Sequence, residues 1–98
     1  MRRRAARVDD NQGVIVDALR AAGVRVHITS QLGNGFPDIL AYRPSTGLMR
    51  LMEIKDGSKP PSARKLTPDE EAFHARFPVW VVNNEFEALE AMGIEVAK

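Results

Sequence analysis

The chain has 98 residues, of which 44% are hydrophobic and 28% are charged, the composition of one small globular domain. It contains no cysteine, which excludes a disulfide framework and a thiolate zinc site and is compatible with a reducing cytoplasm. No apolar run approaches the ~18 residues of a membrane span, and no apolar segment follows the basic N-terminus, so we expect neither a membrane protein nor a signal peptide.

Positive charge is concentrated in two segments, although the net charge is only +1. Residues 1–8 hold four arginines and are expected to form a flexible basic arm ahead of a single domain over residues 9–98. The second segment places Lys59, Arg64 and Lys65 around a proline-rich loop. Charge segregated in this way can attract a polyanion even when the total is near zero. Both segments are therefore candidate DNA-binding regions, and each can equally be a solvated surface.

The domain is expected to begin with a helix followed by a strand. Asp9 or Asp10 can cap the helix, and apolar residues then recur at helical spacing as far as Ala22. Gly23 follows as a C′ residue, which ends the helix. Apolar and polar residues alternate over 24–28, which predicts a half-buried strand.

Two further strands are predicted to form a hairpin. Pro37 cannot donate to a strand ladder and suits a strand start, so a strand is expected over residues 38–43. Residues 44–47 form a turn, and a strand of similar length follows over 48–55.

The second half of the chain is predicted to add a helix, a strand and a last helix. Thr67 and Glu70 form a capping box at the start of a helix that Pro78 ends. A short apolar strand covers 79–82, and Asn84 can cap the final helix. The order α-β-β-β-α-β-α predicts an α/β (α+β) fold in which helices flank a mixed β-sheet.

Two carboxylates and one amine are expected to meet where the hairpin strands lie side by side. Side chains alternate along a strand, so Glu53 and Lys55 share a face, which Asp38 can join if the strands are neighbours. Mg²⁺ takes oxygen ligands and commonly only one or two protein carboxylates, and the carbonyl of Ile54 can supply a third oxygen. Phosphodiester hydrolysis needs a nucleophilic water and stabilisation of charge on the phosphoryl oxygens, and a bound divalent metal can supply both.

The role of Lys55 stays open at this point. It can orient or deprotonate the attacking water, or hold the phosphate. The alternative to any catalytic reading is a surface ion pair between Glu53 and Lys55, with Asp38 capping a loop, and surface pairs of this kind are common.

The spacing of these residues resembles the PD-(D/E)XK nuclease motif, with Pro37-Asp38 followed by Glu53-Ile54-Lys55. The element order also resembles the restriction-endonuclease-like core of that superfamily. Lys59-Pro60-Pro61-Ser62-Ala63-Arg64-Lys65-Leu66-Thr67-Pro68, with Phe73-His74, is similar to the VRR-NUC domain in its small, stand-alone virus-type form. The resemblance covers nearly the whole chain.

The resemblance implies a Mg²⁺- or Mn²⁺-dependent DNA endonuclease that acts as a homodimer on branched DNA such as Holliday junctions. By motif, Asp38 and Glu53 would be metal ligands and Lys55 the catalytic lysine. Gln12 would be the family's polar residue early in the first helix, near the active site. Glu70 stands where the family commonly has Gln; it either adds negative charge near the metal or serves only as the capping-box partner.

Two other functions remain open from the sequence. The Glu70 departure and the basic arm are compatible with a non-catalytic DNA-binding module on a nuclease-like scaffold. The small size is compatible with an interaction subunit that works only within a larger complex.

Overall fold

The computed structural model describes residues 10–96 and has the predicted order of elements. In chain order these are α1 (Asp10–Ala21), β1 (Arg25–Ile28), β2 (Ile39–Arg43), β3 (Leu48–Ile54), α2 (Pro68–His74), β4 (Val79–Val82) and α3 (Glu85–Ala91), with two 3₁₀ turns, η1 (Ser30–Leu32) and η2 (Pro61–Arg64). The prediction of a mixed sheet flanked by helices is confirmed. The basic arm predicted over 1–8 lies outside the described residues. Within 10–96, no helix is long and apolar enough to cross a membrane.

The four strands form one sheet in the order β1-β2-β3-β4. The first three strands are antiparallel neighbours, so the predicted hairpin of β2 and β3 is present, and β4 runs parallel to β3 after the crossover through α2. Strand β2 begins at Ile39 and not at Asp38, and β3 ends at Ile54 and not at Lys55. Pairing of β2 with β3 ends at Ile39–Met52, and beyond it the N–H of Ile54 donates to the Asp38 carboxylate. Strand β3 continues as far as Ile54 because it pairs there with Val82 of β4.

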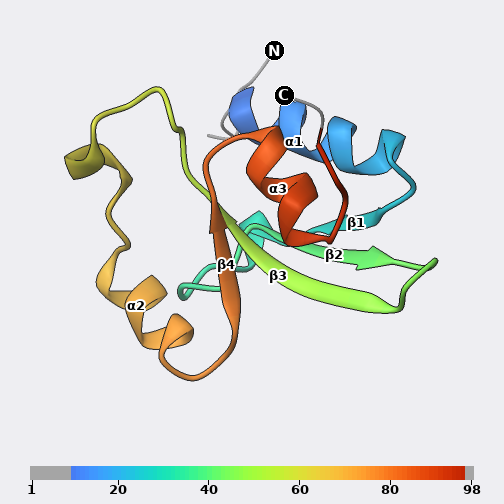
Figure 1. Ribbon diagram of the computed structural model, residues 1–98. Helices are drawn as coiled ribbons and strands as arrows, with labels where there is room; N and C mark the ends of the chain where they lie inside the picture. Colours follow the sequence, from blue (N-terminus) through green and yellow to red (C-terminus); the bar gives the residue numbers. More distant parts are fainter. Residues whose placement is uncertain (1–9, 97–98) are drawn as a thin grey trace, which may run out of the picture.

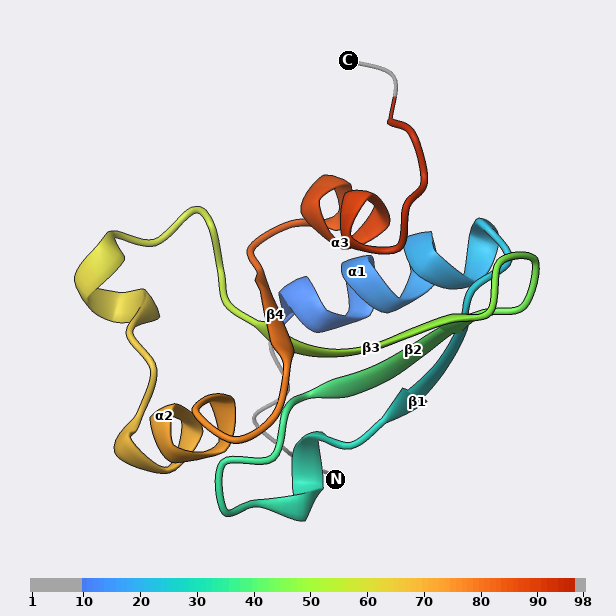
Figure 2. The ribbon, with the colours of Figure 1, turned by 60° about the horizontal axis from the view of Figure 1, so that its bottom comes forward.

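One face of the sheet is covered by α1 and α3, which lie together on the same side (Figures 1 and 2). Burying apolar area between these two layers supplies most of the stabilisation of a small domain. The fully buried side chains come from α1, from α3 and the residue after it, and from three strands: Ile15, Leu19, Ile39, Ala41, Met52, Val82, Ala88 and Met92. The opposite face carries no helix of this pair, and Met49 and Val81 on it are 57% and 43% exposed.

Helix α2 lies apart from α1 and α3 and contributes no buried residue (Figure 2). Thr67 and Glu70 form the capping box predicted from the sequence. The helix ends at His74, earlier than the predicted end at Pro78, and the chain continues in hydrogen-bonded turns, with the N–H of Phe77 donating to the carbonyl of Phe73 at 3.0 Å. A helix with so little burial must be held by particular contacts.

Gly35 makes one of these contacts possible. It has φ of 81°, a conformation that favours glycine, and it lies against the backbone at the start of α2. A Cβ at this position would overlap the carbonyl group of Asp69 and lie 2.9 Å from the backbone nitrogen of Glu70. The loop before β2 and the start of α2 therefore pack backbone against backbone.

Replacing Gly35 by alanine is expected to displace α2, and Gly47→Ala is its matched control. Gly47 has φ of 78° in the hairpin turn, with open space where a Cβ would lie. Both variants should lose about 1–2 kcal/mol of unfolding free energy from the left-handed backbone alone. Gly35→Ala should lose more, and the α2 amides should exchange with solvent faster. Equal losses in urea denaturation, with unchanged α2 exchange, would contradict this packing.

Candidate active site

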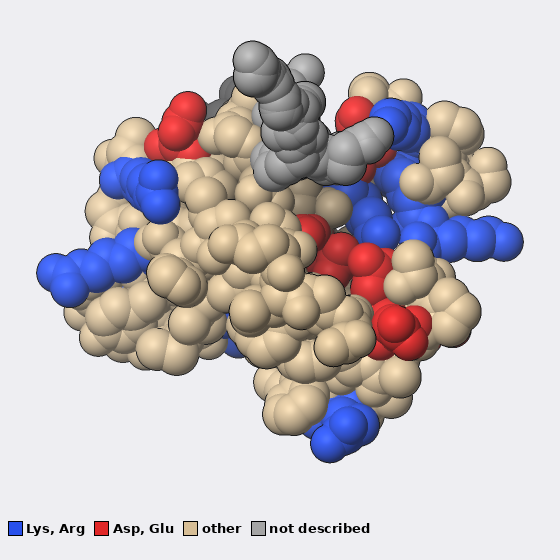
Figure 3. Space-filling model, turned by 180° about the vertical axis from the view of Figure 1, so that it is seen from behind, with Lys and Arg blue, Asp and Glu red and all other residues tan. Residues whose placement is uncertain are grey.

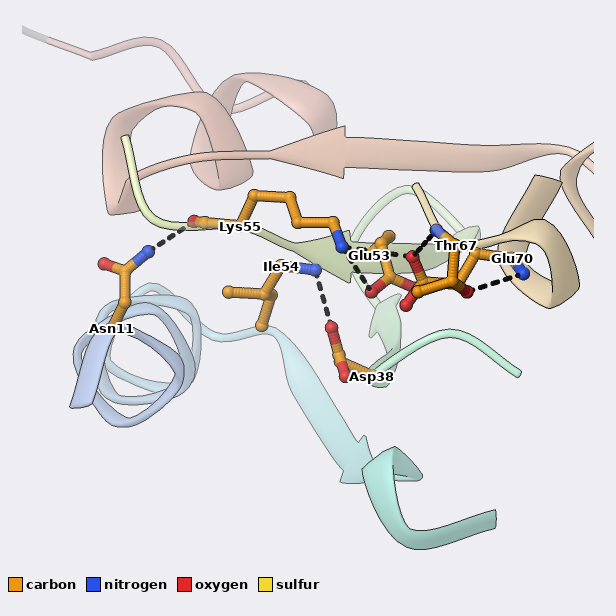
Figure 4. A network of polar contacts seen from close by, with 7 residues as sticks. All are labelled: Asn11, Asp38, Glu53, Ile54, Lys55, Thr67 and Glu70. Atoms are coloured by element: carbon orange, nitrogen blue, oxygen red, sulfur yellow. Dashed lines mark hydrogen bonds and ion pairs between the residues drawn. The ribbon is translucent and has the colours of Figure 1, made fainter. Parts of the chain in front are cut away.

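Asp38 is fixed beside the end of β3 by a long-range hydrogen bond. It lies one residue before β2, and its Oδ2 accepts from the backbone N–H of Ile54 at 2.7 Å (Figure 4). The backbone N–H of Asp38 also donates to the carbonyl of Met52 at 3.0 Å. Burial raises the pKa of Asp38 above its ordinary value, outweighing the N–H of Ile54, which lowers it. The register places Asp38 one step beyond the Ile39–Met52 pair, opposite Glu53.

Glu53 is the most deeply buried acidic residue of this group, at 3% exposure. Its Oε1 is buried and has no hydrogen-bond partner within residues 10–96. Burial, followed by the charge of Asp38, raises the pKa of Glu53 to about 9. The Glu53 carboxyl is therefore protonated at neutral pH in the absence of a cation.

Lys55 completes the group and connects it to α2. Its Nζ lies 3.0 Å from Oε1 of Glu70 and 3.8 Å from Oε2 of Glu53. The same Oε1 of Glu70 accepts from the N–H of Thr67 at 2.9 Å. Burial raises the pKa of Glu70, but the Thr67 N–H and the Lys55 ammonium lower it more, so that it lies below its ordinary value. Glu70 is thus both the capping-box partner and a negative charge beside Lys55.

The donor set suits a hard divalent cation. Oε1 of Glu53 is a buried oxygen without a partner, Asp38 faces it, and the hydrogen bond from Ile54 keeps that backbone beside the Asp38 carboxylate. Within residues 10–96, no three His, Cys, Asp or Glu side chains gather closely enough to form a metal site alone. A cation here would rest on two carboxylates, the Ile54 carbonyl and water, which is the way proteins commonly hold Mg²⁺.

The first helix contributes Asn11 to this region, a residue that sequence reasoning missed. Its Nδ2 donates to the carbonyl of Lys55 at 2.6 Å and to that of Asn83 at 3.1 Å, which ties the ends of β3 and β4 to α1. Gln12, the predicted site residue, is 5% exposed, and within the described residues its side chain makes no hydrogen bond to Asp38, Glu53 or Lys55. Its role near the active site stays a prediction.

The basic residues of the β3–α2 connection lie on the loop that arches away from the sheet (Figure 1). Lys59 and Lys65 are exposed, whereas Arg64 is half-buried and donates to the carbonyl of Lys59 at 2.7 Å. Arg64 also lies 3.5 Å from Oδ1 of Asn83, so it holds the loop against the end of β4. Figure 3 shows acidic side chains gathered at one part of the surface with Lys and Arg side chains next to them.

Comparison with known proteins identifies the fold. No protein-family model matches the sequence, and no curated protein matches it either. A solved structure described as a VRR_NUC domain superposes with a TM-score of 0.61 at 26% sequence identity, over 84% of this chain and 89% of that one. The chain has the fold of a VRR-NUC domain and is nuclease-like. The resemblance to the VRR-NUC domain drawn from the sequence is confirmed. Within this fold, Asp38, Glu53 and Lys55 lie close together where β2 begins and β3 ends.

Proposed function

We propose that this VRR-NUC domain is a metal-dependent, structure-specific DNA endonuclease that hydrolyses phosphodiester bonds at branched DNA such as Holliday junctions. The observation that carries the proposal is the buried Glu53 carboxyl, which has an unpartnered oxygen, faces Asp38 and lies 3.8 Å from the ammonium of Lys55. Burying a carboxyl oxygen without a hydrogen-bond partner is costly whether or not the group is ionised, so such a group is more readily explained by chemistry than by stability.

The residues divide into ligands and a cationic group. Asp38, Glu53 and the carbonyl of Ile54 would hold Mg²⁺ or Mn²⁺, which when bound acidifies a water and neutralises developing phosphoryl charge. The ammonium of Lys55 lies within 4 Å of the Glu53 carboxyl group, beside the proposed metal ligands. As an ammonium it can hold a non-bridging phosphate oxygen or orient the attacking water, and only as the neutral amine can it accept the proton of that water. Lys59, Arg64 and Lys65 would contact neighbouring phosphates, which gives sequence-independent and salt-dependent affinity.

We further propose that the active form is a homodimer. The sheet face away from α1 and α3 carries exposed apolar side chains, including Met49 and Val81, and Glu53 lies on the same face as its strand partner Val81. A 98-residue chain buries a limited core by itself, so association would add stability. A two-fold axis would present two sites to two strands, which suits a branched substrate.

Cleavage of matched junction, flap, single-stranded and linear DNA, each with and without Mg²⁺ or Mn²⁺, tests the proposed activity. We expect metal-dependent products and a preference for branched DNA. Lys55→Ala and Glu53→Gln should each slow cleavage by about 10²- to 10⁴-fold, since they remove a proton-transfer or ligand group. Glu95→Gln, at an exposed glutamate outside the site, is the control. DNA binding without any metal-dependent product, or full activity of Glu53→Gln, would instead favour a non-catalytic DNA-binding module.

The two roles of Glu70 can be separated by a pair of substitutions. Glu70→Gln keeps a side chain that can cap α2 but removes the charge that holds Lys55. Thr67→Ala removes the capping hydroxyl, at a cost of about 1 kcal/mol, and keeps the ion pair. We expect Glu70→Gln to raise the cleavage rate a few-fold, on the order of the ~1 kcal/mol of a screened ion pair, because Lys55 is freed for the phosphate. Thr67→Ala should lower the unfolding free energy and leave the rate of the folded protein unchanged.

The opposite pattern has a clear meaning. A Glu70→Gln variant as inactive as Glu53→Gln would assign the Glu70 carboxylate a direct part in catalysis and contradict the positioning role. A loss of activity in Thr67→Ala at temperatures where it is fully folded would show that the cap itself places Lys55.

A further inference from the structure

Three phenylalanine rings form a stack that starts beside the proposed site. The rings of Phe36 and Phe73 lie 5.1 Å apart edge to face, and those of Phe73 and Phe77 lie 4.6 Å apart, with an angle of 29° between their planes. Phe36 precedes Asp38 by two residues, and Phe73 follows Glu70 by three, so both ends of the first pair are attached to site residues. The stack therefore has a fixed position relative to the carboxylates.

The outer ring of this stack is open to solvent. Phe77 is 43% exposed, although an aromatic ring of its size favours burial. Its backbone is nevertheless ordered, since the N–H groups of Arg76 and Phe77 both donate to the carbonyl of Phe73 at 3.0 Å. An ordered, exposed ring is a suitable surface for another flat group, because little side-chain freedom is lost when that group binds.

Arg76 adds positive charge at the same place, with its guanidinium lying loosely over the Phe77 ring. Its guanidinium carbon is 5.5 Å from the centre of the Phe77 ring, whereas that of Arg50 lies 3.8 Å over Trp80 and is also held by the carbonyl of Ala91. Arg76 is exposed, so its guanidinium can move to a phosphate while the ring takes a base.

We propose that Phe77 is a stacking site for an unpaired nucleobase of the DNA substrate, with Arg76 on the adjoining phosphate. The inference rests on the proposed nuclease function and narrows its substrate to DNA with an unpaired base near the cut. Every base has a flat face, so the site would select an unpaired structure and not a sequence. If Phe77 served only in packing, its apolar volume would be sufficient, and leucine could replace it.

Equilibrium binding in EDTA tests this site without any cleavage step. Two fluorescein-labelled duplexes are compared by anisotropy, one with a central bulge of three unpaired nucleotides and one with the same bulge made abasic. The wild-type chain should bind the base-bearing DNA about tenfold more tightly, within the range of one base–aromatic stack. Phe77→Ala and Phe77→Leu should both lose this preference. Phe86→Ala, at a 50% exposed phenylalanine on α3, should keep it.

Each other result overturns the inference. Equal affinity of the wild-type chain for both duplexes, or no binding to either, means that no base is recognised. A preference kept by Phe77→Leu assigns the ring a packing role, and a preference lost in Phe86→Ala means that the effect is not local to Phe77. The nuclease proposal fails separately: a wild-type chain with the base preference that cuts no DNA in Mg²⁺ or Mn²⁺ refutes the activity and keeps the stacking site.

Discussion

The hydrogen bond from the Ile54 N–H to the Asp38 carboxylate is the contact on which the rest of the site depends. It is a side-chain bond that lies just beyond the last β2–β3 pair, Ile39–Met52, while β3 stays paired with β4 as far as Ile54. It also keeps Asp38 opposite Glu53, which leaves two carboxyl groups close together in a buried place. Burial raises the pKa of Glu53, and the neighbouring charge of Asp38 raises it further, because like charges in such a place cannot both ionise easily.

Helix α2 depends on the same region and has little else to hold it. It buries no residue of its own, and its position comes from the Lys55–Glu70 ion pair, the Phe36–Phe73 contact and the backbone approach at Gly35. Helix packing against the sheet is therefore coupled to the placement of the lysine. A ligand that attracts Lys55 away from Glu70 would loosen one of the three contacts and keep the other two, which links events at the site to the exposed ring at the far end of α2.

The sequence predicted the parts of the fold that local rules control. Strand alternation put Glu53 and Lys55 on one face, and the turn at 44–47 predicted the hairpin that brings Asp38 to them. The capping box of Thr67 and Glu70 was visible because its two residues lie three apart. Each of these features depends on a fixed spacing within a single element or a short turn.

Long-range contacts were not predictable in the same way. The bond from Asn11 to the Lys55 carbonyl spans 44 residues, and no spacing rule distinguishes Asn11 from its neighbour Gln12. Lys55 and Glu70, which form an ion pair, are separated along the chain by an irregular loop with a 3₁₀ turn. Hydrophobic periodicity does not predict the conformation of such a loop, so it does not predict how close the two residues lie. The strand ends were wrong by one residue because they depend on where pairing with the neighbouring strands stops, at Ile39–Met52 and at Ile54–Val82, which local patterns do not determine.

Calorimetric titration of the protein with Mn²⁺, in two buffers of different ionisation enthalpy near neutral pH, tests the central claim most directly. Because the pKa of Glu53 is about 9 without a cation, a metal bound by this carboxylate must displace its proton. We expect saturable binding with release of about one proton per ion. Glu95→Gln should keep both the binding and the proton release, and Glu53→Gln should lose both. Binding of unchanged strength in Glu53→Gln, or binding by the wild-type chain with no proton release, would contradict a metal centre built on Glu53.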